Sequence, residues 1–97
     1  MRKLSEIKGE EAIDVLAEII MPITEIVKDD EVVQVFETNV AQCVAIALKK
    51  HRSEVIDVLA VINGKTKDET LEEIDLMTLP TVLIEILNEP SVQMLFR

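Results

Sequence analysis

The sequence predicts an all-α fold, a compact bundle of about six short helices in a single domain that covers residues 1–97. Three observations support this prediction. Apolar runs have helical length, capping residues precede them, and no segment sustains the alternation of apolar and polar residues that a strand requires. The apolar residues are also mostly aliphatic, with two Phe and no Trp or Tyr, which is typical of interdigitating helices.

The first predicted helix begins after Gly9, with acidic residues in its first turn, where they suit the helix dipole. Between Ala12 and Met21 only Asp14 and Glu18 are polar, and they lie four residues apart. Such a helix has one narrow polar stripe, and the rest of its surface needs to be covered.

Pro22 predicts a break in this helix. Proline lacks a backbone N–H, and its ring clashes with the preceding turn. We therefore expect the first helix to end or kink at Pro22 and a separate short helix to cover Ile23–Lys28, with the proline in its first turn.

Capping residues mark the next two helices. Asp29-Asp30 offers an N-cap for a helix over Glu31–Glu37, and Thr38 or Asn39 can cap a helix over Val40–His51. Because the body of the second helix is almost wholly apolar, we expect it at the centre of the fold.

Ser53 and Gly64 bound the following helix as predicted N-cap and stop. Within Val55–Ile62 only Asp57 is polar, so this helix is expected to be buried nearly all round. The segment Lys65–Thr70 is the most polar of the chain, and we predict an exposed loop there.

The last third of the chain contains three weaker signals. Thr70 and Glu73 have capping-box spacing. Thr78 precedes Pro80, which suits the first turn of a helix. A last short helix or docked tail is expected over Ser91–Phe96.

Composition restricts the possible partners. Ten basic and nineteen acidic residues give a net charge of −9, which opposes binding to nucleic acid and to anionic membranes. The longest apolar run, Val40–Leu48 with Gln42 inside it, is far shorter than the roughly 20 residues that span a bilayer. We therefore expect neither a nucleic-acid partner nor a membrane partner. The single cysteine, Cys43, allows no internal disulfide framework, so a cytoplasmic location is expected.

Apolar residues make up 48% of this short chain, and its mean hydropathy is +0.26. One small core cannot cover that much apolar surface. The sequence therefore predicts a homo-oligomer or a bound partner, and self-association is expected through the broad apolar faces of Ala12–Met21 or Val82–Leu87.

The residues that could support catalysis do not form a recognisable site. Cys43 and His51 lie eight residues apart on one predicted helix, more than two turns, so they do not make a nucleophile–base pair. The acidic groups Asp29–Glu31 and Asp68–Glu73 lack the pattern of a calcium loop, and no glycine-rich phosphate loop is present. We expect no enzyme activity, catalytic residue, cofactor or metal.

The basic cluster Lys49–Arg52 allows two interpretations. The favoured one is a charge cap, in which positive side chains face the negative end of a helix dipole. The alternative is contact with an acidic face of a neighbouring subunit. Cys43 is interpreted as a buried, small apolar residue.

Three segments distributed between residues 2 and 90 share a pattern of apolar spacing and turns with a known family. They are the opening, Arg2–Ala17, the helix with its glycine stop, Val55–Gly64, and the end, Leu76–Pro80 with Ile86–Pro90. In these residues the chain resembles the tail assembly chaperones of long-tailed (siphovirus-type) bacteriophages and prophages of Gram-positive bacteria.

The resemblance implies a role in assembly of the phage tail. Such chaperones coat the long, aggregation-prone tape-measure protein while tail-tube subunits polymerise around it. The implied partners are the tape-measure protein and, as a second candidate, the tail-tube protein. The implied location is the cytoplasm of the bacterial host, with no copy in the mature virion.

A different class of function fits the same composition, namely a small acidic adaptor or regulatory protein that sequesters a compact partner. A structural component of the tail is a third class, which predicts that the protein is present in virions. For partner binding, the candidates are the apolar residues near the end of the chain, which are expected to be exposed: Leu87, Val92, Met94, Leu95 and Phe96. Core packing is the alternative role for each of them.

Overall fold

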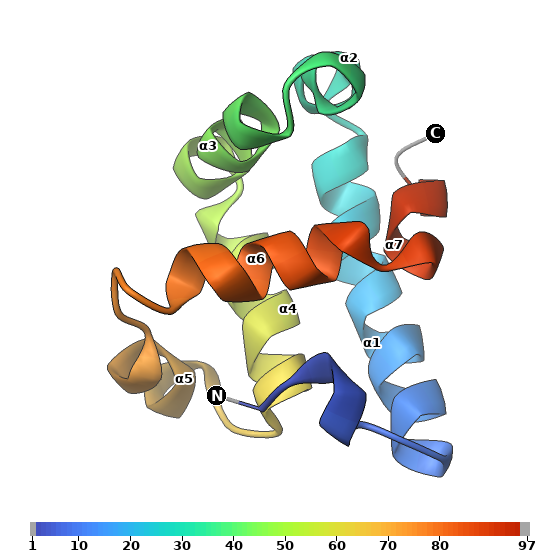
Figure 1. The fold of residues 1–97 in the computed structure, drawn as a ribbon, viewed down its shortest axis with the longest axis vertical. Coiled ribbons are helices and arrows are strands. Elements are labelled where there is room, and N and C mark those ends of the chain that lie inside the picture. The colour runs from blue at the N-terminus through green and yellow to red at the C-terminus, as the bar shows by residue number, and fades with distance from the viewer. Residues whose placement is uncertain (1, 96–97) are drawn as a thin grey trace.

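The computed structural model describes residues 2–95 of the chain, without the side chain of Ser91. Over this range the chain forms seven α-helices, one short 3-10 helix and no strand, which confirms the predicted all-α fold (Figure 1). The elements are η1 (Leu4–Glu6), α1 (Glu10–Val27), α2 (Asp30–Thr38), α3 (Val40–Lys50), α4 (Arg52–Asn63), α5 (Lys67–Glu73), α6 (Leu79–Asn88) and α7 (Pro90–Leu95).

Helix α1 continues through Pro22 for 18 residues, so the predicted end at the proline and the separate helix over Ile23–Lys28 are wrong. Buried isoleucines lie on both sides of the proline, Ile19 before it and Ile23 after it, and they anchor both halves of α1 in one core. This shared packing offsets the roughly 3 kcal/mol that proline costs inside a helix. Thr24 also donates a hydrogen bond from its hydroxyl to the carbonyl of Ile20, 2.7 Å away.

The predicted caps of α2 and α3 are confirmed. The Asp29 carboxylate accepts a hydrogen bond from the backbone N–H of Glu31 at 3.0 Å, and the Asn39 side chain accepts one from Gln42 at 3.1 Å. Each bond satisfies a backbone donor that has no partner within its own helix.

Helix α3 is not at the centre of the fold, so that prediction is wrong. Only Cys43 is fully buried in it, while Ala41 and Ala45 are exposed. Alanines made this segment look apolar in the sequence, but each offers little area to bury, and one side of α3 faces solvent.

Helix α4 forms the centre instead. Its buried side chains include Val58, Leu59 and Ile62, and it lies between α1, α3 and α5. Ser53 lies inside its first turn, because the N-cap is His51 and the helix begins two residues earlier than predicted. Gly64 ends the helix as predicted, with φ +70°, a conformation that favours glycine.

Helix α5 occupies the segment predicted as an exposed loop. Thr66 and Glu69, rather than Thr70 and Glu73, form a capping box, with both reciprocal hydrogen bonds at 3.1 Å. One face of this polar helix packs against α4, and Thr70 on that face is completely buried.

Helices α6 and α7 complete the fold. Thr78 precedes α6, with Pro80 in the first turn, and α7 agrees with the predicted last helix. In Figure 1, α6 (orange) crosses α4 and α1, and α7 lies beside α1. No helix among residues 2–95 is long and apolar enough to cross a membrane.

Candidate partner-binding surfaces

Helix α1 carries an exposed apolar surface, which we call the α1 stripe. Its members recur at helical spacing and are Ile13, Leu16, Ala17, Ile20 and Met21. Ile13 is 69% exposed and Met21 is 75% exposed. Large apolar side chains grouped along one helix are typical of a surface that another protein covers.

The α1 stripe exists because the apolar side of this helix is wider than the core that covers it. Ile19, Ile23 and Ile26 point into the core. The stripe lies beside that buried face, and the acidic side chains Asp14 and Glu18 are on the remaining side. The sequence predicted this surplus from the single polar pair between Ala12 and Met21.

The predicted partner-binding residues near the end of the chain differ in how far the structure exposes them. Met94 is 75% exposed, as expected, whereas Leu87 and Leu95 are half-buried and pack against the core. Val92 is only 3% exposed, so the expected exposure is wrong for this residue. Its side chain lies on the side of α7 that faces α1 and α6. Phe96 lies outside the described residues.

A second exposed apolar feature lies in the connection between α5 and α6. Leu76 and Met77 are each 86% exposed. Asp75 holds this turn, because its carboxylate accepts hydrogen bonds from the backbone N–H and the hydroxyl of Thr78 at 2.8 and 2.9 Å. Two large apolar residues directly before a predicted cap are the sequence signal for this feature.

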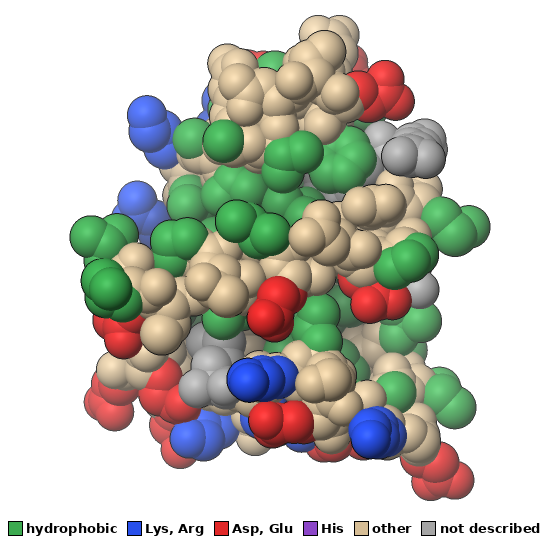
Figure 2. Space-filling model, viewed as in Figure 1, with side chains coloured by type: hydrophobic (Ala, Val, Ile, Leu, Met, Phe, Trp, Pro, Cys, Tyr) green, Lys and Arg blue, Asp and Glu red, His purple; other side chains and the backbone are tan. Residues whose placement is uncertain are grey.

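An apolar hollow of about 70 Å³ lies between α6 and the helices beneath it, and we call it the α6 groove. Every side chain that lines it is apolar. Those beneath it include Ile23 and Ile26 of α1, Cys43 of α3, and Val58 and Leu59 of α4, and those of α6 are Leu83, Ile86 and Leu87. Figure 2 shows hydrophobic side chains gathered along the edge of α6 that faces α3.

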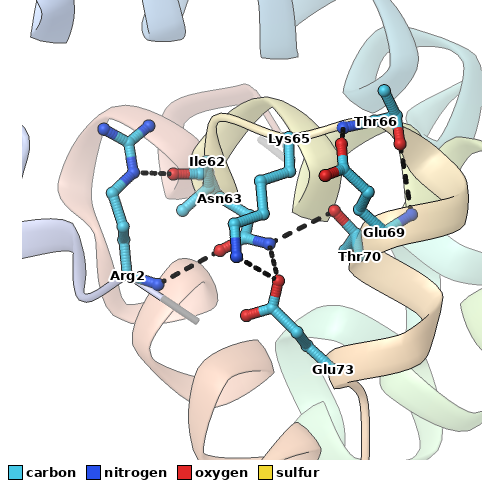
Figure 3. A network of polar contacts seen from close by, with 8 residues as sticks. All are labelled: Arg2, Ile62, Asn63, Lys65, Thr66, Glu69, Thr70 and Glu73. Atoms are coloured by element: carbon cyan, nitrogen blue, oxygen red, sulfur yellow. Dashed lines mark hydrogen bonds and ion pairs between the residues drawn. The ribbon is translucent and has the colours of Figure 1, made fainter.

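A polar network joins the N-terminal segment to α4 and α5 (Figure 3). Arg2 donates to the carbonyl of Ile62 at 2.8 Å, and its backbone N–H donates to the Asn63 side chain at 3.4 Å. The Asn63 amide donates to Glu73 at 2.9 Å, and Lys65 donates to the same carboxylate oxygen at 2.8 Å. Because these groups satisfy one another, we assign the network a structural role.

Hydrogen bonds from Lys65 and Asn63 lower the pKa of Glu73 to about 2. The same ion pair raises the pKa of Lys65. Both effects stabilise the charged forms that the network uses, so the network is strongest near neutral pH.

The basic cluster at the end of α3 has acidic partners within the chain. The His51 ring lies 2.9 Å from the Asp29 carboxylate, and Lys50 lies 2.8 Å from the carboxylate of Glu31. The contact with His51 is the main cause that lowers the pKa of Asp29. Neither interpretation of the cluster predicted these carboxylate partners at the start of α2. Lys49 and Lys50 do lie in the last turn of α3, the position that the charge-cap interpretation requires.

Cys43 is buried, and burial raises the pKa of its thiol, which disfavours the reactive thiolate. Within residues 2–95, no group of three or more His, Cys, Asp or Glu side chains is placed to hold a metal ion. The apolar features described above are the α1 stripe, the turn at Leu76 and Met77, the exposed Met94 and the α6 groove. Comparisons with known protein families, with curated proteins and with solved structures found no match to this chain.

Proposed function

We propose that this protein is a tail assembly chaperone, which binds apolar helical segments of a tape-measure protein and keeps them soluble while the tail tube polymerises. The α1 stripe is the observation that carries the proposal. It offers an exposed apolar helix face to a partner helix, and the likeness of three chain segments to such chaperones agrees with this use.

Helix-to-helix packing supplies the recognition in this proposal. An amphipathic helix of the tape-measure protein lies along the α1 stripe with its apolar residues between Ile13, Leu16 and Ile20. Burial of apolar area contributes about 25 cal/mol per Å², less the cost of ordering both surfaces. A broad apolar face without polar readout suits a chaperone that has to bind many different segments of one long protein.

The negative charge of this chain keeps its complex with the partner soluble. The chain has a net charge of −9, and Asp14 and Glu18 lie on the side of α1 that a partner on the stripe leaves exposed. Many bound copies would surround the partner with negative charge, and this repulsion keeps coated complexes apart. The protein acts in the host cytoplasm, with the tail-tube protein as a second candidate partner, and leaves before the virion is complete.

Co-expression with a tape-measure protein of a long-tailed bacteriophage or prophage tests the proposal. We expect the tape-measure protein to move from the insoluble to the soluble fraction and to be recovered in a complex with several copies of this chain. Replacement of Ile13 and Met21 by Gln should abolish that effect, because both side chains are strongly exposed on the stripe.

Leu71→Gln is the matched control, because Leu71 is also exposed (48%) but lies on α5. Equal insolubility of the tape-measure protein with and without this chain, and no complex, would refute the proposal. Recovery of a compact partner in a one-to-one complex would instead favour the adaptor function.

A further inference from the structure

The α6 groove has a buried floor and a partly exposed rim. Cys43 and Leu59 of the floor are 2% and 1% exposed. Leu48 of α3 and Leu83 and Leu87 of α6 line the same hollow but are only half-buried. Figure 2 shows apolar side chains along this edge of α6. Because all the lining side chains are apolar, an apolar side chain of another molecule can enter without leaving a polar side chain unpaired.

The volume of the groove limits what can fill it. About 70 Å³ is unfilled. An engineered cavity of about 150 Å³, roughly twice as large, holds a benzene ring. The α6 groove therefore suits the end of one aliphatic side chain, such as Leu or Met, rather than an aromatic ring or a whole helix. Filling it would give its lining atoms the contacts that they lack on that side.

The connection over residues 74–78, which we call the α5–α6 turn, presents two side chains of this kind. Leu76 and Met77 are each 86% exposed. Thr78 donates hydrogen bonds from its backbone N–H and its hydroxyl to the Asp75 carboxylate at 2.8 and 2.9 Å, which hold the turn closed. An apolar pair on a turn that is already ordered loses little conformational entropy on binding. Met77 also adapts its shape to a pocket.

The turn and the groove lie close together along α6. The helix begins at Leu79, directly after the turn, and Leu83 of the groove follows four residues later, about 6 Å along the helix axis. If two α6 helices lie antiparallel with their first turns side by side, the turn of each copy therefore comes over the groove of the other. One twofold axis relates the two contacts.

The side of α6 that would meet a second copy is uncharged. Glu85 is the one charged residue within α6. It follows Leu83 by two residues, about 200° around the helix, and it lies beside Lys3 of the N-terminal segment. Ile84, which is 52% exposed, lies on the outer side next to Leu87. Two chains of net charge −9 can therefore approach along this side without bringing the carboxylates of α6 together.

We propose that two copies of this chain form a twofold symmetric dimer in which the α5–α6 turn of each copy binds the α6 groove of the other. Met77 fills the hollow, and Leu76 packs on its rim. The same contact covers Ile84 between the two antiparallel helices.

A second copy accounts for both apolar features at once. It fills each groove and covers each turn, whereas an unrelated side chain in the groove would leave Leu76 and Met77 exposed. The α1 stripe takes no part in this contact, so the inference does not depend on the proposed chaperone function.

Substitutions on the turn test the dimer. The double variant Leu76→Gln/Met77→Gln should raise the dissociation constant by about tenfold or more, because four apolar side chains per dimer lose their favourable burial. Met94→Gln is the matched control, because Met94 is also strongly exposed (75%) but lies on α7, and it should leave the dissociation constant unchanged. Sedimentation equilibrium measures each mass against the 10.9 kDa of one chain, and circular dichroism checks that the helices persist.

A disulfide cross-link tests the position of the turn in the groove. Met77→Cys places a thiol on the turn, and Cys43 lines the groove. Oxidation with diamide should join the introduced thiol to Cys43 of the other copy, and the reduced protein should run as a monomer on a denaturing gel. Mass spectrometry of the linked peptides identifies the pair. The link should be absent from Met94→Cys and from Met77→Cys combined with Cys43→Ala.

A wild-type chain that stays monomeric up to hundreds of micromolar would overturn the inference. A dimer that ignores both Gln substitutions would overturn it too and would point to the α1 stripe as the interface. A dimer that the Gln substitutions weaken but that forms no link to Cys43 would exclude the groove as the receiving site. If a chain that is monomeric alone links Cys43 to a cysteine in an added tape-measure segment, a foreign side chain takes the groove instead.

Discussion

At the scale of single residues, Asn63 shows how one buried polar side chain connects three segments. It is 5% exposed, and its amide contacts Arg2 of the N-terminal segment and Thr70 and Glu73 of α5. A buried amide is stable only when such partners are present. The network therefore fixes how α5 and the N-terminal segment lie against the end of α4.

Glu73 makes this network sensitive to acid. Its pKa falls from about 4.5 to about 2 on folding, so between these pH values the unfolded chain binds a proton that the folded chain does not. The free energy of unfolding should therefore fall as the pH is lowered from 4.5 toward 2. We expect the Tm difference between wild type and Glu73→Gln to be largest above about pH 5 and to shrink across this window.

Thermal unfolding followed by circular dichroism between about pH 2.5 and pH 6 measures that difference. Glu72→Gln is the control, because it removes the same charge from an exposed position on α5. A Tm difference for Glu73→Gln that stays constant over the whole range would contradict the assignment of the ion pair to Glu73.

At the scale of elements, α1 shows tertiary packing overriding a local rule. Proline disfavours a helix interior because it lacks an N–H and crowds the preceding turn. The buried residues Ile19, Ile23 and Ile26 nevertheless hold the two halves of α1 in one helix. Core packing of both halves of α1 offsets the free-energy cost of the proline, so the helix does not end there.

Replacement of Pro22 by Ala should recover part of this cost. Alanine restores the backbone N–H inside α1, so we expect the free energy of unfolding to rise by about 1–3 kcal/mol. Pro80→Ala is the matched control, because Pro80 lies in the first turn of α6, where no N–H partner is lost, and a change near zero is expected. Urea denaturation measures both variants, and a less stable Pro22→Ala chain would argue against a continuous α1.

At the scale of the whole molecule, the core is centred on α4 and is small. The described chain has a radius of gyration of 12.7 Å, and Leu59 and Ile62 lie at its centre, each 1% exposed. Other large apolar residues, among them Ile13 and Met77, stay on the surface. The molecule therefore combines a thin core with a surplus of exposed apolar area, which suits association with a second chain.

Truncation of the core should be costly for so small a protein. Leu59→Ala removes a fully buried side chain and should lower the free energy of unfolding by about 2–5 kcal/mol. Leu76→Ala deletes the same atoms from a side chain that is 86% exposed, and it should change the monomer's stability by less than about 0.5 kcal/mol. Urea denaturation at low protein concentration compares the two, and equal losses would refute the position of α4 at the centre.

The sequence by itself determined the features that depend on neighbouring residues. Helical periodicity set the fold class, because apolar spacing alone decides which face of a helix can be buried. The caps at Asp29 and Asn39 and the stop at Gly64 were predictable because each satisfies its own helix end. The surplus of apolar surface on α1 was also predictable, because Asp14 and Glu18 are the only polar residues within Ala12–Met21.

Only the tertiary structure decided features that depend on distant residues. Whether α1 breaks at Pro22 depends on a shared core that no local pattern contains. The burial of Val92 and the exposure of α3 depend on how α6, α7 and α4 cross, and that arrangement follows from the packing of the complete chain. The α6 groove has the same origin, because it is a gap between five helices, and only their crossing creates it.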